Sequence, residues 1–140
     1  FKLIKNFFNK DELKVYQKYC YNKVDQNKDY ELDGQSFSPA WYNDPLMNAI
    51  LDIKLPIVEK ESNLKLYPTY AYWRYYVFGA ILAKHTDRPA CEVSITTCYD
   101  QKHWRPGIYK GEGMAQVFLH YVDKIGPFKD HAYDAVNKES

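Results

Sequence analysis

Arginine is scarce in this chain, because only three of the 19 basic residues are arginine and the rest are lysine. The 18 acidic residues leave a formal net charge of +1, which gives no bulk positive field for binding a phosphate backbone, so no nucleic-acid partner is expected. Arginine differs from lysine in that its planar, always charged fork can hold a carboxylate through two hydrogen bonds. The three arginines, Arg74, Arg88 and Arg105, are therefore candidates for binding a carboxylate.

Cysteine and long apolar runs are also scarce. Cys20, Cys91 and Cys98 form an odd set without a CxxC pair, which argues against a disulfide framework or a structural zinc site. This usage is typical of a reducing compartment, and we expect a cytoplasmic protein. No run approaches the ~18 consecutive apolar residues that span a bilayer. The opening FKLIKNFFNK is not ordered like a signal peptide, so no membrane partner is expected.

The length and composition of the chain are typical of one globular domain. The chain has 140 residues, of which 46% are hydrophobic and 26% are charged, values that exclude a disordered or fibrous protein. This length suits a single domain that buries most of its apolar surface. Aromatic residues make up 17% of the chain, including 14 tyrosines.

The order of helical and extended patterns predicts an α+β domain. Asn9 and Glu12 form a capping box before a helix over about 10–24, and Asn43-Asp44-Pro45 begins a second helix that runs to about 62. Pro56 is expected to kink or split the second helix, and residues 25–43 are expected to form loop or short edge strands. Strands are predicted over 70–82, 91–97 and 115–121. Helices followed by strands indicate helices that brace an antiparallel sheet or barrel.

The triplet His85-Thr86-Asp87 follows the first predicted strand. Residues two apart on extended backbone point to the same face, so His85 and Asp87 should converge. Two histidines and one carboxylate on one side of an iron are the ligand set of non-haem Fe(II) oxygenases, and His103 is the candidate third ligand. An ordinary hydrogen-bonded His–Asp pair is the alternative.

Several blocks around this triplet resemble the 2-oxoglutarate and Fe(II)-dependent oxygenases of the prolyl 4-hydroxylase type, in particular small bacterial and phage members. The blocks are Pro68–Tyr72, Arg74–Tyr76, His85–Ser94, His103–Arg105 and Ala115–Tyr121. The resemblance covers roughly residues 66–134, with a looser match to the N-terminal helices.

The resemblance implies a double-stranded β-helix (jelly-roll) barrel in a single oxygenase domain, 1–140, with helical support over about 1–65 and the barrel over about 66–134. It implies a dioxygenase that uses O2 and Fe(II), with 2-oxoglutarate as cosubstrate, to hydroxylate a protein or peptide at proline; it leaves ascorbate open as an accessory cofactor. His85, Asp87 and His103 match the iron ligands. Tyr76, or Tyr75 if the alignment slips by one residue, matches the tyrosine that approaches 2-oxoglutarate.

Two departures from the family pattern affect these expectations. His103 comes only 16 residues after Asp87, which leaves too few strands to close a barrel. We therefore expect a segment to be missing near the Asp100–Gln101 junction; the alternative is a naturally minimised barrel that binds no metal. The second departure is Gly113, which stands where the family usually carries a basic residue for the far carboxylate of 2-oxoglutarate.

The arginines are the candidates for this missing basic residue. Arg74 is the first, because it shares a strand face with Tyr76; Arg105 is the second and Lys110 the third. Arg88 is expected to meet the substrate or to orient Asp87. The alternative for each arginine is an ion pair with an Asp or Glu at the barrel rim.

The remaining residues of interest are expected to be structural. His120 is predicted to be a satisfied core or edge histidine, His131 to be solvated, and Cys91 and Cys98 to be small strand packers. Three aromatic residues could line a groove for an extended peptide: Trp73, Tyr75 and Trp104. Two other functions remain open, a non-catalytic jelly-roll binding domain and a metal-dependent jelly-roll enzyme that does not use 2-oxoglutarate.

Overall fold

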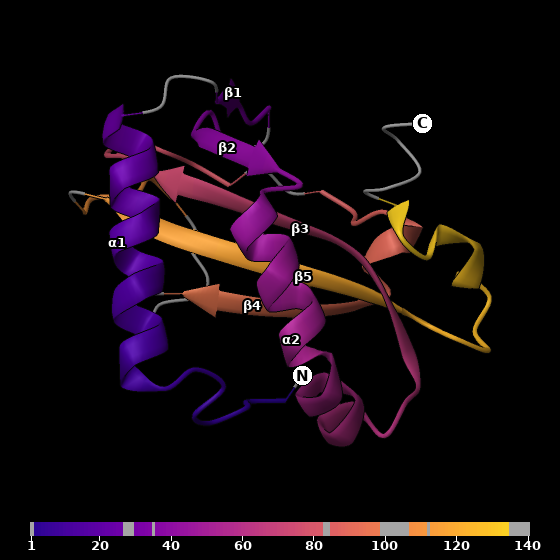
Figure 1. Ribbon diagram of the computed structural model, residues 1–140. Helices are drawn as coiled ribbons and strands as arrows, with labels where there is room; N and C mark the ends of the chain where they lie inside the picture. The colour runs from indigo at the N-terminus through magenta and orange to yellow at the C-terminus, as the bar shows by residue number, and fades with distance from the viewer. Residues whose placement is uncertain are drawn as a thin grey trace.

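The computed structural model describes residues 2–26, 30–34, 36–82, 85–98, 107–111 and 113–134. The elements are α1 (Lys10–Gln26), β1 (Glu31–Leu32), β2 (Pro39–Tyr42), α2 (Pro45–Ser62), β3 (Leu66–Tyr76), β4 (Val93–Cys98) and β5 (Met114–Asp123), with short 3₁₀ helices at η1 (Pro89–Cys91) and η2 (Lys129–His131) (Figure 1). The predicted α+β class is confirmed. The Asp100–Gln101 junction lies outside the described residues.

Helix α1 begins at the predicted capping box. The Asn9 side chain accepts hydrogen bonds from the backbone N–H groups of Asp11 and Glu12, and the Glu12 carboxylate accepts one from the Asn9 N–H. Tyr16 and Cys20, one helical turn apart, are the buried residues of the helix. Their spacing places one stripe of α1 against the rest of the domain.

Helix α2 is capped by Asp44, whose carboxylate accepts hydrogen bonds from the N–H groups of Leu46 and Met47 at 3.0 and 3.3 Å. Pro45 stands in the first turn, where a missing N–H costs nothing, and Asn63 ends the helix in the left-handed conformation, with φ of 57°. The helix runs through Pro56 as one element, so a split at that residue was wrong.

The strands form one five-stranded antiparallel sheet in the order β1-β2-β3-β5-β4. The long strands β3 and β5 pair along their whole length, with a bulge between Pro68 and Ala71. The described residues form an open sheet, so a closed jelly-roll barrel is not shown. The predicted edge strands in 25–43 are β1 and β2.

The first predicted strand ends earlier than expected. It was predicted to reach residue 82, but β3 ends at Tyr76 and the chain turns at Gly79, where φ is +89°. Gly79 N–H donates to the Tyr109 carbonyl at 2.8 Å, and Tyr109 N–H donates to the Ala80 carbonyl at 2.7 Å. These bonds hold the turn against the segment before β5.

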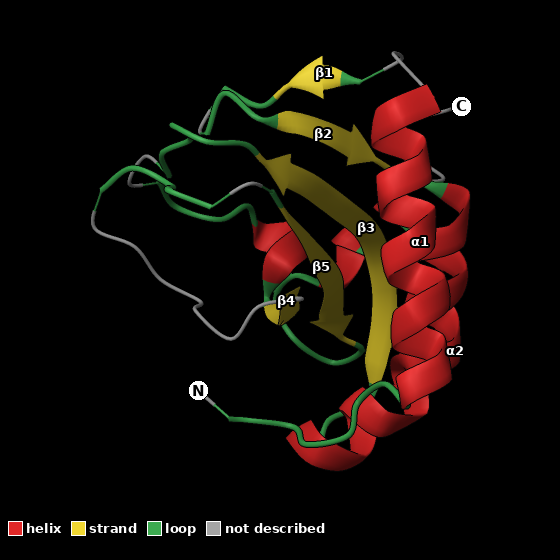
Figure 2. Ribbon diagram, turned by 90° about the vertical axis from the view of Figure 1, so that its left-hand side faces the viewer, coloured by secondary structure: helices red, strands yellow, loops and turns green. Residues whose placement is uncertain are grey.

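Both helices lie on one face of the sheet (Figure 2). The strands alternate, so Trp41, Trp73, Val117 and Leu119 point to this face and form the main core with the helices. The rings of Trp41 and Trp73 are stacked with centroids 4.1 Å apart. The opposite face carries neither α1 nor α2, and alternate residues of the same strands are presented there.

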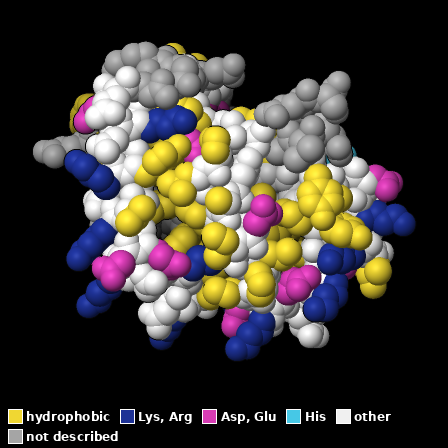
Figure 3. Space-filling model, in the orientation of Figure 1, with side chains coloured by type: hydrophobic (Ala, Val, Ile, Leu, Met, Phe, Trp, Pro, Cys, Tyr) yellow, Lys and Arg dark blue, Asp and Glu magenta, His cyan; other side chains and the backbone are white. Residues whose placement is uncertain are grey.

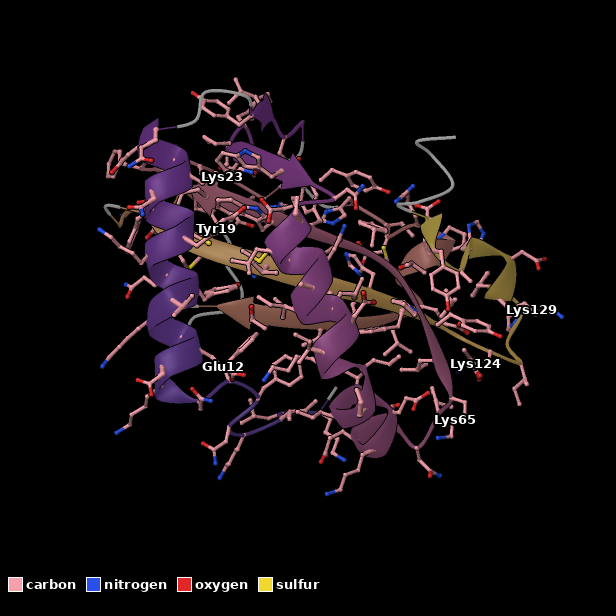
Figure 4. All side chains as sticks on the ribbon, in the orientation of Figure 1. Glu12, Tyr19, Lys23, Lys65, Lys124 and Lys129 are labelled. Carbon is pink, nitrogen blue, oxygen red and sulfur yellow. The ribbon has the colours of Figure 1, made fainter. Side chains whose placement is uncertain are left out.

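Three polar contacts join α1 to α2 and its cap, and Figure 4 labels the α1 residues that make them, Glu12, Tyr19 and Lys23. Glu12 forms an ion pair with the buried Lys54 at 3.0 Å. Tyr19 donates a hydrogen bond to Asp44 at 2.7 Å, and Lys23 lies 2.9 Å from the same carboxylate. Burial alone would raise the pKa of Asp44, but the bonds from Tyr19 and Lys23 outweigh it and hold this pKa below its usual value.

The surface on the side of the two helices carries both apolar and charged side chains. Apolar side chains gather in the strip between α1 and α2, and Lys, Asp and Glu surround them (Figure 3). Val15 and Ile53 are among the exposed apolar residues of these helices. In the part of the chain that the structure describes, no helix is both long and apolar enough to cross a bilayer.

Candidate functional site

The face of the sheet opposite the helices carries an open cavity of about 840 Å³. Strands β3, β4 and β5 supply its floor, and the loops at 33–34 and 85–88 lie at its rim. The strand register builds the floor, since Tyr72 pairs with Phe118 and Arg74 pairs with Gln116. Because side chains alternate along a strand, these four residues share one face.

His85 and Asp87 converge at this cavity, as their spacing predicts. His85 Nε2 lies 3.4 Å from Asp87 Oδ1, and the two side chains are 29% and 63% exposed. Both residues line the cavity. An imidazole nitrogen and a carboxylate oxygen at this separation are two donors that a divalent transition metal accepts.

The third predicted ligand, His103, and the second candidate for the cosubstrate carboxylate, Arg105, lie outside the described residues. Within the described ranges, no group of three His, Cys, Asp or Glu side chains is close enough to hold a metal ion. The described part of the site therefore supplies two of the three predicted ligands.

Arg74 is buried in the cavity floor, on the face that it was predicted to share with Tyr76. Its Nη1 lies 3.4 Å from the Tyr76 hydroxyl. The same Nη1 lies 3.0 Å from the Asp33 carboxylate, and both side chains of this ion pair are 6% exposed. The alternative role expected for Arg74, an ion pair with a carboxylate of the chain itself, is therefore present.

The tyrosine predicted to approach a cosubstrate does not line the cavity. Tyr76 is buried in a small cluster with Ala80, Tyr109 and Met114. Its neighbour Tyr75 faces the helices, where its ring meets the edge of Tyr21 at 6.0 Å. This alternative therefore lies on the wrong face of β3.

Tyr72 is the tyrosine that lines the cavity beside Arg74, and sequence reasoning missed it. Burial raises the pKa of the Tyr72 hydroxyl to about 12; the Arg74 cation opposes this rise and the Asp33 carboxylate adds to it. The hydroxyl is therefore protonated at neutral pH and can donate a hydrogen bond. The signal that could have found it was the alternation of residues 70, 72 and 74.

Gly113 is explained by packing on the helix face. A Cβ at this position would overlap the Tyr75 ring and hydroxyl, so a longer side chain requires Tyr75 to move. Lys110, the third candidate for the missing cation, is exposed and does not line the cavity. Among the described candidates, only Arg74 lies in the cavity floor.

Arg88 connects the 85–88 segment to other parts of the rim. Its Nη2 lies 3.0 Å from the Asp134 carboxylate, which also accepts a hydrogen bond from the Tyr42 hydroxyl at 3.2 Å. The guanidinium lies over the Tyr70 ring, 4.7 Å from the centroid. The segment that carries His85 and Asp87 is thus held by a residue near the end of the described chain.

His120 is buried in the floor and hydrogen-bonded, as a satisfied histidine should be. Its Nδ1 lies 2.8 Å from Ser94 Oγ. Burial lowers its pKa to about 4, the Asp87 carboxylate opposes this shift, and the ring is neutral at pH 7. Sequence reasoning did not place this residue, or Phe118, in the site.

The predicted peptide groove was wrong in two of its three residues. Trp73 is fully buried in the core and Tyr75 faces the helices; Trp104 lies outside the described residues. His131 lies in η2, away from the cavity. Burial raises the pKa of the Cys91 thiol, which disfavours a nucleophilic role, and nothing is described of the Cys98 side chain.

The chain matches no protein-family model, no curated protein and no solved structure.

Proposed function

We propose that this chain is an Fe(II)- and 2-oxoglutarate-dependent dioxygenase that hydroxylates a protein or peptide, most favourably at proline. The observation that carries the proposal is the convergence of His85 and Asp87 at a cavity on the face of the antiparallel sheet opposite α1 and α2. The resemblance of the surrounding blocks to the prolyl 4-hydroxylase type supports the same assignment.

The proposal includes the finer fold. The open sheet with its helices on one face would be one wall of a double-stranded β-helix, and the cavity face would look into the barrel. The cytoplasmic location is proposed from the cysteine usage, since Cys20 and Cys91 are free thiols among the described residues.

The donor types of His85 and Asp87 suit a bound iron. His85 and Asp87 would supply a nitrogen and an oxygen ligand, and His103 would supply the third. Iron, together with 2-oxoglutarate and O2, supplies the oxidising chemistry when bound, and the protein supplies orientation and a shielded pocket.

The cavity walls suit a proline ring better than a charged side chain. Tyr42, Tyr70 and Phe118 line it with aromatic surface. Its two arginines are paired with carboxylates of the chain, Arg74 with Asp33 and Arg88 with Asp134, and Asp87 lies beside His85 as the other carboxylate of the lining. Aromatic rings hold an apolar ring by contact area and fix its orientation. These side chains would exclude water and hold the substrate near the metal ligands.

The experiment is a titration of the purified protein with Mn²⁺ as a redox-inert probe. His85→Ala and Asp87→Ala should each weaken binding by at least about 10-fold, since even residues that only support metal ligands contribute 10–100-fold. Circular dichroism should show an intact fold, because these rim residues are not in the core. His131→Ala, which removes a histidine away from the cavity, should bind Mn²⁺ like the wild type; undiminished binding in both site variants would overturn the assignment.

A second candidate is a metal-dependent enzyme that does not use 2-oxoglutarate. The ion pair of Arg74 with Asp33 favours it, because the cation in the cavity floor already has a carboxylate partner. Metal binding that depends on His85 and Asp87, together with no 2-oxoglutarate binding by any variant, would support this candidate over the first.

A further inference from the structure

The floor of the cavity holds an arginine that is surrounded on several sides by aromatic rings. The Arg74 guanidinium carbon lies 5.3 Å from the centroid of Tyr72, 5.7 Å from that of Tyr76 and 5.1 Å from that of Phe118. Ring faces attract a cation, most strongly where water is excluded. The three rings hold the guanidinium in a fixed place at the bottom of an open cavity. This arrangement, called the Arg74 box below, forms a binding site for an anion.

The chain fills this site with its own carboxylate. Asp33 Oδ2 lies 3.0 Å from Arg74 Nη1, and the carboxylate also accepts a hydrogen bond from Ser36 Oγ at 2.9 Å. Asp33 and the adjacent Gly34 line the cavity. Both partners of this ion pair therefore belong to the lining of the cavity, where a free carboxylate would have to bind Arg74.

The segment that carries Asp33 is held mainly by a local turn, in which Asp33 N–H donates to the Ser38 carbonyl at 2.9 Å and Phe37 N–H donates to the Asp33 carbonyl at 2.7 Å. It follows β1, whose pairing with β2 involves only Glu31 and Leu32. Phe37, at the far side of the turn, has φ of +53° and a side chain that is 66% exposed. A non-glycine residue in the left-handed region stores strain, and an exposed aromatic ring gains little from burial. Displacing this segment would leave the core strands β3 and β5 unchanged.

Binding of a ligand carboxylate to Arg74 while Asp33 remains bound would carry a large cost in free energy. Two negative charges on one guanidinium in a desolvated floor leave a net negative charge, and like charges this close disfavour each other's ionised form. A ligand carboxylate and the Asp33 carboxylate should therefore exclude one another.

We propose that Asp33 is an internal carboxylate that closes the Arg74 site and is displaced when a small carboxylate ligand binds. The identity of that ligand as 2-oxoglutarate rests on the proposed function. The exchange of Asp33 for a ligand carboxylate rests only on the Arg74 box and on the Asp33 carboxylate that fills it. The apparent affinity for the ligand is then reduced by the fraction of molecules in which Asp33 is bound, as for any site that is open in only part of the population. Asp33 sets the concentration of carboxylate at which the site fills.

The experiment compares the wild type with Asp33→Asn by isothermal titration, with 2-oxoglutarate and with succinate, in the presence and absence of Mn²⁺. Asparagine keeps the size of the side chain and an acceptor for Ser36 but removes the charge. Asp33→Asn should bind both dicarboxylates about 10-fold more tightly than the wild type. Asp130→Asn, which removes an exposed carboxylate away from the cavity, is the matched control and should leave both affinities unchanged.

A second variant guards against misfolding of the first. Ser36→Ala removes one hydrogen bond to the Asp33 carboxylate and leaves the ion pair in place, so it should tighten dicarboxylate binding by a smaller factor of about 2–5-fold. A thermal melt of each variant establishes that the protein is folded.

The outcomes separate the exchange from the proposed function. Tighter succinate binding by Asp33→Asn, in a protein that never turns over 2-oxoglutarate, supports the exchange and overturns the dioxygenase. Turnover of 2-oxoglutarate by the wild type, with equal or weaker binding in Asp33→Asn, overturns the exchange, because Asp33 then supports the ligand instead of competing with it. Failure of the wild type and of both variants to bind either dicarboxylate also overturns it.

Discussion

His120 links the stability of the protein to pH. Its ring lies 4.6 Å from the centroid of Tyr70, and burial lowers its pKa from the ordinary value of 6.5 to about 4, with Asp87 opposing and Arg88 reinforcing the shift. Between these two pH values the unfolded chain binds a proton that the folded chain does not. The free energy of unfolding should therefore fall as the pH drops from about 6.5 to about 4, by about 3 kcal/mol at most.

His120→Asn tests this dependence. The asparagine oxygen can accept the hydrogen bond from Ser94 and does not titrate in this range. We expect the unfolding free energy of the wild type to lose about 3 kcal/mol relative to the variant between pH 7 and pH 4, because carboxylates common to both proteins cancel. Urea denaturation with a metal chelator present measures it; a constant difference between the two proteins over this range would contradict the account.

Single residues were predictable where a local rule applied. The spacing of His85 and Asp87 fixed their common direction, and alternation placed Arg74 and Tyr76 on one face of β3. The partner Asp33 was not predictable, because it lies in the turn after β1 and reaches Arg74 only through the pairing of β1, β2 and β3. Likewise Tyr76 lies beyond the cavity edge because the chain turns soon after it.

At the level of elements, the segment 85–88 carries the candidate ligands without secondary structure of its own. Its strongest described tether is the ion pair of Arg88 with Asp134, reinforced by Tyr42. Asp134→Asn should weaken Mn²⁺ binding by about 10-fold, as loss of a supporting residue does at other metal sites. The thermal stability should change little, because the pair is partly exposed.

The matched control for this prediction is again Asp130→Asn, which should bind Mn²⁺ like the wild type. Exchanging the charges, with Arg88→Asp and Asp134→Arg together, should restore part of the lost affinity if the pair acts as a tether. Wild-type affinity in Asp134→Asn would show that Arg88 does not position the ligands.

Helix boundaries were predictable because the caps are local, as at Asn9, Asp44 and Pro45. The ends of strands were less predictable than those of helices. The turn at Gly79 depends on backbone hydrogen bonds to Tyr109, which no local pattern encodes. The continuity of α2 through Pro56 shows that tertiary packing can hold a helix over a residue that disfavours it.

At the scale of the whole molecule, the predicted α+β class and order of elements are confirmed, whereas the closed jelly-roll barrel that the resemblance implied is not shown by the described residues. The apolar faces of amphipathic helices and alternating strands predict that the helices pack against the sheet. That both helices lie on the same face of the sheet is a finding of the structure (Figure 2). Closure depends on which strands pair at the two edges, and the described residues leave β1 and β4 as those edges. The cavity that results is the feature on which the proposed activity depends.

The most direct test is the formation of succinate from 2-oxoglutarate by the wild-type protein supplied with Fe(II), measured with and without O2. The account predicts succinate only when O2 is present, loss of that signal in His85→Ala and Asp87→Ala, and its retention in His131→Ala. No O2-dependent succinate from the wild type, or undiminished succinate from both site variants, would contradict it.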